Sequence, residues 1–199
     1  MNTFLAVAEA CTLAVCAIAT PATAHEQVYG TVLSGASEFP VNDSKGGGAA
    51  IVTFDLDQFT MRVQTTFAGL SGNVTASHIH CCTSVPGQGN IGVATQLPTF
   101  TGFPLGNTFG SYDHTFEMGL ASSYNPAFIT ANGGTVSSAF SALLAGVDEG
   151  RAYLNIHSTF APGGEIRGFL APVPESSTYV LMFAGLAAVG WVRRRKSTV

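Results

Sequence analysis

Apolar and polar side chains mostly alternate along the chain between residues 25 and 172. Alternation with a period of two is typical of strands that bury one face, and Gly, Pro and Asn interrupt it about every ten residues. We therefore predict seven strands, over residues 28–33, 50–56, 61–67, 74–80, 112–118, 152–159 and 165–170. The second and third runs meet at Asp57-Gln58, which predicts a hairpin.

Two short helices are predicted between the fifth and sixth strands. Asn125 can cap one helix with Pro126 at its first position, and Thr135 can cap a second over residues 136–145, which Gly146 would end. The predicted fold class is all-β: an antiparallel β sandwich or Greek-key barrel with two short connecting helices.

The N-terminal end has a continuous apolar run instead of alternation. Residues 4–20 are mostly apolar, and Ala22-Thr23-Ala24 gives the small-x-small pattern that signal peptidase accepts. We predict a signal peptide over residues 1–24, with a buried helix of a cytosolic domain as the alternative.

The C-terminal end has an uncharged segment followed by the basic block Arg193 to Lys196. We predict a single transmembrane helix over about residues 176–192, with the basic tail 193–196 on the cytoplasmic side. The chain then divides into residues 1–24, a body of residues 25–172 outside the cytoplasm, and a C-terminal segment of residues 173–199.

The charge of the body differs from that of the chain ends. The chain has 199 residues, enough for one domain of ordinary size, and its eight Lys and Arg include the four of the tail. Residues 25–172 keep four basic residues against ten acidic ones, a net charge of 4 − 10 = −6. Such a body has no basic stripe for phosphates, which argues against nucleic acid as a partner.

The mature body has only two cysteines, the adjacent pair Cys81 and Cys82, because Cys11 and Cys16 lie in the predicted signal peptide. Because the compartment outside the cytoplasm is oxidising, we predict a disulfide between these two adjacent residues. Binding of a metal by Cys82 and cross-linking between molecules are the alternatives.

Three histidines are candidate metal ligands. His78 and His80 leave the same face of one predicted strand, about 6.5 to 7 Å apart at the backbone, and His157 lies on a late strand. Cys82 would join that face if the strand continued. Imidazole and thiolate suit zinc or copper, so we predict a site of His78, His80 and His157, with Cys82 as a weaker candidate. The alternative is a structural polar cluster in which the histidines satisfy backbone groups.

Two other groups are read as structural. His114 is flanked at a period of two by Tyr112 and Phe116, which favours a buried histidine over a ligand. Glu165 and Arg167 are expected as an exposed pair on one face of the last strand.

Four segments resemble the CHRD family, the repeat domain first named in chordin. They read Val32-Leu33-Ser34-Gly35-Ala36-Ser37-Glu38-Phe39-Pro40, Ser77-His78-Ile79-His80, Ala152-Tyr153-Leu154-Asn155-Ile156-His157 and Pro162-Gly163-Gly164-Glu165-Ile166-Arg167-Gly168. The resemblance implies a β-sandwich module of extracellular proteins over about residues 28–170. The family usually continues His-Ile-His with Gly-Pro, so no role for the cysteines follows from it.

The C-terminal layout resembles the PEP-CTERM sorting signal of Gram-negative bacteria that make exopolysaccharide. Val173, Pro174 and Glu175 precede the apolar segment and the Arg-rich end, as in that signal. The resemblance implies processing by an exosortase after export, with transient anchoring in the inner membrane before the protein reaches the cell surface. An ordinary single-pass tail anchor is the alternative.

Two functions fit these observations. The first is an exported, surface-sorted CHRD protein with a structural or binding role in the extracellular matrix or exopolysaccharide layer, not an enzyme. Its partners would be signal peptidase, the exosortase, and exopolysaccharide or a matrix protein. The second is an extracytoplasmic copper or zinc protein that uses the three histidines, with redox activity included. No segment matches a nucleophile elbow, a phosphate loop or a dinucleotide fingerprint.

Overall fold

A computed structural model describes residues 25–174 of the chain. The predicted signal peptide, the predicted transmembrane segment, the basic tail and Glu175 of the predicted sorting motif lie outside the described residues. Within residues 25–174, no helix has the length and apolar character needed to cross a membrane.

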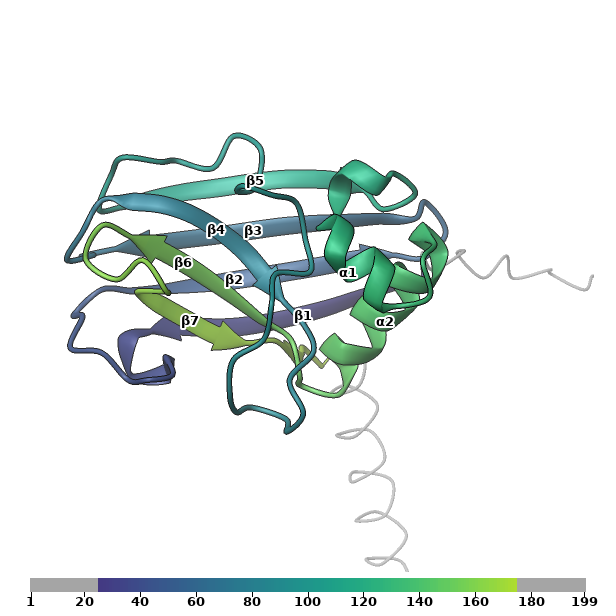
Figure 1. Cartoon of the computed structure of the whole chain (residues 1–199). Coiled ribbons are helices and arrows are strands. Elements are labelled where there is room, and N and C mark those ends of the chain that lie inside the picture. Colours follow the sequence, from purple (N-terminus) through teal and green to yellow (C-terminus); the bar gives the residue numbers. More distant parts are fainter. Residues whose placement is uncertain (1–24, 175–199) are drawn as a thin grey trace, which may run out of the picture.

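The strands form one antiparallel sheet in the order β4-β6-β7-β1-β2-β3-β5, and β8 pairs with β1. Their bounds are β1 Glu26–Ser34, β2 Gly47–Asp55, β3 Thr60–Ala68, β4 Val74–His80, β5 Gly110–Glu117, β6 Tyr153–Ser158, β7 Ile166–Phe169 and β8 Ala171–Pro172. The all-β class is confirmed. In the described part of the chain, however, the strands make a single open sheet that curls (Figure 1), not two separate sheets or a closed barrel.

The hairpin predicted at Asp57-Gln58 is present between β2 and β3. The Asp55 carboxylate accepts hydrogen bonds from the backbone N–H groups of Asp57 and Gln58, at 3.0 and 2.9 Å. An aspartate that bonds the backbone two residues further on forms a turn by itself, and this sets the register Asp55 opposite Thr60.

The long connection from β4 to β5 covers the free edge of β4. Backbone N–H groups of this connection, from Ala94, Thr95, Phe100 and Gly106, donate to carbonyls of β4 at 2.9 to 3.3 Å. The edge strand therefore has partners although the sheet does not close.

The core lies inside the curl and combines the apolar side chains that the period of two predicts with others from the helices and connections. The largest fully buried apolar ones include Phe54, Met61, Ile79, Leu154 and Ile156. Tyr29 and Phe140 both meet the ring of Phe54 edge to face, which joins β1, β2 and the second helix.

Two α-helices lie together at one end of the sheet (Figure 1). They are α1, Pro126–Ala131, and α2, Val136–Asp148; two short 3-10 helices, η1 (Gly35–Ser37) and η2 (Ala121–Ser123), complete the fold. The predicted caps are confirmed, because the side chains of Asn125 and Thr135 accept from backbone N–H groups of the first turns. The predicted end of α2 at Gly146 is wrong: the helix continues to Asp148, and Gly146 lies inside it for a packing reason described below.

Candidate metal centre

The pairing of β4 with β6 brings the three predicted histidines together. His78 lies opposite Asn155 and His80 opposite Tyr153, while His157 lies opposite Ala76, two residues before His78. One ring nitrogen from each histidine belongs to a group in which all ligand atoms lie within 4.8 Å of one another. We call His78, His80 and His157 the histidine cluster.

In each ring of the cluster, one nitrogen lies at hydrogen-bond distance from a backbone carbonyl oxygen. Nε2 of His78 lies 2.6 Å from the oxygen of Pro98, Nδ1 of His80 lies 2.8 Å from that of Ile91, and Nδ1 of His157 lies 2.9 Å from that of Pro162. A carbonyl oxygen only accepts, so each of these nitrogens carries the hydrogen and donates it. In a neutral imidazole the second nitrogen then has a free lone pair.

The free lone pairs are Nδ1 of His78, Nε2 of His80 and Nε2 of His157. The two Nε2 atoms face each other at 3.4 Å, and Nδ1 of His78 is buried without a hydrogen-bond partner among the described residues. Buried acceptors that lack a donor are costly, typically about 1–3 kcal/mol each. Among the described residues, this cost falls on Nδ1 of His78.

The three imidazole rings are not protonated near neutral pH. Burial lowers the pKa of His78 and of His80 from 6.5 to about 4, in spite of the carbonyls that favour the charged form. Burial also lowers the pKa of His157. At pH 7 the three rings are neutral, which is the form that binds metals.

The distance between two of the histidines fits a transition-metal ion. Two nitrogens bound to one tetrahedral zinc at about 2.0–2.1 Å lie about 3.4 Å apart, and His80 Nε2 and His157 Nε2 are 3.4 Å apart. Carbonyls that accept from the remote ring nitrogen are the usual outer contacts of metal-binding histidines, because they fix the tautomer and the ring orientation.

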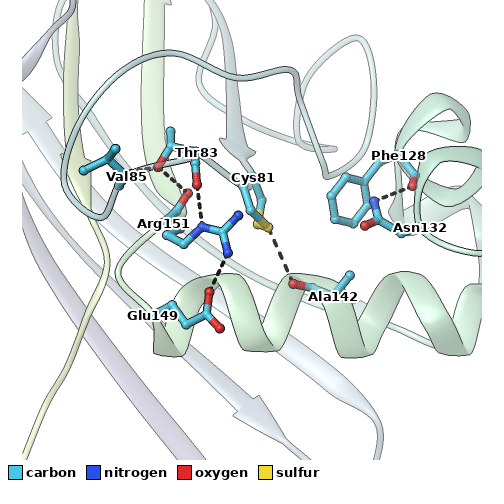
Figure 2. Close-up of a disulfide and its surroundings, with 9 residues drawn as sticks. Cys81, Thr83, Val85, Phe128, Asn132, Ala142, Glu149 and Arg151 are labelled. Carbon is cyan, nitrogen blue, oxygen red and sulfur yellow. Dashed lines mark hydrogen bonds and ion pairs between the residues drawn. A yellow bond between two sulfur atoms is a disulfide. The ribbon is translucent and has the colours of Figure 1, made fainter.

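The group does not include Cys82. Cys81 and Cys82 are joined in a disulfide, and Sγ of Cys82 lies 3.6 Å from the carbonyl oxygen of Ala142 in α2. Figure 2 shows the disulfide above α2, with Phe128 and Asn132 of the α1 region across from it and Arg151 beside it. Gly146 lies directly under the disulfide, where a Cβ would overlap both sulfur atoms.

A stack of polar side chains extends from the histidine cluster across the sheet. The ring of Tyr153 stacks on His80 with centroids 4.9 Å apart, and the guanidinium of Arg167 lies 4.6 Å from the Tyr153 centroid. Arg167 donates to the carbonyls of Ser37 and Gly89, at 2.6 and 3.0 Å. Arg167 thereby holds η1 and the connection after β4 over the outer face of the sheet.

Glu38 lies beside this stack in a buried position. Its Oε2 is 3.7 Å from Nε of Arg167, whereas its Oε1 and the Oδ1 of Asn155 have no hydrogen-bond partner among the described residues. Burial raises the pKa of Glu38 from 4.5 to about 7, although the nearby Arg167 charge acts in the opposite direction.

The expectation that Glu165 and Arg167 form an exposed pair is wrong, because both are buried. Glu165 precedes β7 and accepts from the hydroxyls of Ser44 and Ser158 and from the backbone N–H groups of Ser71 and Gly72. Burial would raise the pKa of Glu165, but these hydrogen bonds lower it below its usual value. The two charged residues thus organise two separate sets of loops.

The remaining histidines lie apart from the cluster. His114 is half-buried between Tyr112 and Phe116, with ring centroids 6.1 and 4.7 Å away. His25 is exposed, and its Nδ1 lies 3.2 Å from Oδ1 of Asp57.

Sequence reasoning missed the buried roles of Glu38, Tyr153, Asn155 and Arg167. All four lie in the segments that resemble the CHRD family, and this resemblance was the signal in the sequence that could have pointed to them. Their contacts are separated by up to 130 residues in the chain, as between Arg167 and Ser37, and no local spacing reveals such a contact.

The fold and the site define an all-β module with a covered three-histidine cluster on the outer face of its sheet. The family model of the CHRD domain matches residues 29–170, and the chain belongs to this family. Membership indicates an extracellular or binding-type role. No curated protein and no solved structure matches the chain.

Proposed function

We propose that this CHRD protein binds a copper or zinc ion outside the cytoplasm through His78, His80 and His157. The observation that carries the proposal is the closeness of three imidazoles, with one ring nitrogen of each within 4.8 Å of the others, on rings that each donate to a backbone carbonyl. The three bonds to carbonyls would also suit a structural polar cluster, but Nδ1 of His78 is buried without a hydrogen-bond partner among the described residues, which favours a metal ion.

The donor set favours zinc and copper over harder ions. Three neutral imidazoles suit zinc and copper, whereas magnesium and calcium prefer carboxylate and carbonyl oxygens. Three protein ligands leave a fourth position of a tetrahedral ion for water or an external ligand. We propose a binding role for this site and not an enzymatic one.

Zinc titration of the purified full-length protein tests this proposal. We expect one equivalent of zinc to bind, and His157→Ala to weaken binding at least tenfold because it removes one of three ligands. His25→Ala is the matched control, since His25 is exposed and lies outside the cluster. Equal zinc binding by wild type and His157→Ala would contradict the proposal.

We also propose that the protein is exported by its signal peptide and sorted to the cell surface by the segment that starts at Val173. The Val-Pro-Glu motif, the apolar segment and the basic end support this address. At the surface, exopolysaccharide or a matrix protein would be the partner.

A truncation tests the sorting proposal. The backbone N–H of Val173 donates to the carbonyl of Val28 at 2.8 Å, so the stop codon should follow Val173 to keep this contact. Removal of residues 174–199 should leave a secreted protein that no longer stays at the surface. Unchanged surface localisation of the truncated protein would refute sorting by this segment.

A further inference from the structure

The Cys81–Cys82 disulfide is seated on one face of α2. Cys81 is buried, Sγ of Cys82 lies 3.6 Å from the carbonyl oxygen of Ala142, and the absence of a side chain at Gly146 makes room for both sulfurs. A glycine inside a helix is unfavourable, so its presence here is explained by this contact.

Two free thiols cannot occupy the same place. Bonded sulfurs are about 2.05 Å apart, whereas atoms that are not bonded need about 3.5–4.0 Å between their centres. After reduction, at least one sulfur must move away from Gly146.

A cavity of about 360 Å³ lies on the other side of the disulfide. The cysteine pair lines it together with Ile91, Gly92 and Val93 from the connection after β4, and with Phe128 from α1. This cavity gives a displaced thiol somewhere to move, and it gives a small reductant access to the sulfurs.

The same connection holds His80 in its metal-binding form. The backbone N–H of Cys81 donates to the carbonyl of Gly92 at 3.3 Å, and the neighbouring carbonyl of Ile91 accepts from Nδ1 of His80 at 2.8 Å. A movement of Cys81 therefore acts on the carbonyl that fixes the tautomer and orientation of His80.

We infer that the Cys81–Cys82 pair is a thiol-exchange site that controls the metal affinity of the histidine cluster. A small dithiol reduces the disulfide: the sulfur–sulfur bond breaks, two thiols form, and the dithiol gives up two electrons and two protons to become a disulfide. The disulfide form holds the connection after β4 in place and binds metal tightly, and the dithiol form binds it weakly. This inference rests on the proposed metal binding.

Zinc titration of the full-length protein in its two redox forms tests the inference. Cys11 and Cys16 are changed to Ser in every protein compared, so that Cys81–Cys82 is the only reducible bond. One sample is kept oxidised, and the other is reduced with a dithiol and freed of it under anaerobic conditions. We expect reduction to weaken zinc binding at least tenfold, the size of effect known for lost outer contacts of metal ligands, and reoxidation to restore the affinity.

A second variant, Cys81→Ser with Cys82→Ser, lacks both the disulfide and the thiols and should bind zinc as weakly as the reduced protein. Equal affinity of the oxidised and reduced proteins, or tighter binding after reduction, overturns the inference but leaves the proposed function intact. Absence of zinc binding in the oxidised protein overturns the proposed function, and the inference with it.

Discussion

At the scale of single residues, the histidine cluster depends on which ring nitrogen carries the hydrogen. The carbonyls of Pro98, Ile91 and Pro162 make that choice for the three rings, and they leave the lone pair on Nδ1 of His78 but on Nε2 of His80 and of His157. The site therefore requires correctly placed loop carbonyls as well as histidines.

Gly164 permits the close packing of Glu38 and Asn155 beside the cluster. Its φ is +138°, and a Cβ there would lie 2.7 Å from Oδ1 of Asn155 and 2.8 Å from Oε1 of Glu38. We predict that Gly164→Ala lowers the free energy of unfolding by at least about 2 kcal/mol, through backbone strain and overlap together. Urea denaturation measures the loss.

Gly163→Ala is the control for this prediction, because a Cβ at position 163 meets nothing within 4 Å. Its effect should stay within about 0.5 kcal/mol, as for other surface substitutions. Similar losses for the two alanine variants would contradict the packing described for Gly164.

Glu38 should make stability depend on pH. Its pKa in the folded protein, about 7, is above its ordinary value of 4.5, so its contribution is full below pH 4.5 and is lost as pH rises through 7. Glu38→Gln stays neutral at every pH. We predict that the free energy of unfolding of this variant, relative to that of wild type, rises by roughly 3 kcal/mol between pH 5 and pH 8.

Denaturation of both proteins at pH 5 and pH 8 checks this prediction, with Glu117→Gln on the exposed face of β5 as the control. A difference between Glu38→Gln and wild type that is the same at both pH values would show that the carboxyl is ionised throughout.

At the scale of elements, the packing of the disulfide against α2 outweighs the helix preference of the residue at position 146. Alanine favours a helix over glycine by about 1 kcal/mol. We nevertheless predict that Gly146→Ala destabilises the protein by about 1–3 kcal/mol, because the new Cβ would overlap both sulfurs of the disulfide. Thermal unfolding measures the change, and Ser141→Ala on the exposed side of α2 is the control. A stabilised Gly146→Ala variant would contradict the seating of the disulfide on α2.

The elements that the sequence predicts well are those with local signals. The period of two located β4 over residues 74–80, and the caps Asn125 and Thr135 located the starts of both helices. The end of α2 was misplaced because glycine is an ordinary stop signal, and only the distant Cys81–Cys82 pair explains its place inside the helix.

At the scale of the whole molecule, the curl of the sheet and the path of the β4–β5 connection could not be predicted. They depend on contacts between distant parts of the chain, such as Phe100 with Ser77 and Arg167 with Gly89. The grouping of the histidines needed only His-x-His on one strand and a late histidine on a strand that could pair with it. The roles of Glu38 and Arg167 needed the complete fold.

The central claim is that three imidazoles of this CHRD protein hold one metal ion. X-ray absorption spectroscopy of the full-length protein loaded with one equivalent of zinc tests it most directly. The claim predicts three imidazole nitrogens at about 2.0–2.1 Å from zinc and no sulfur. A sulfur neighbour at about 2.3 Å, or a shell of oxygens without imidazole, would contradict it.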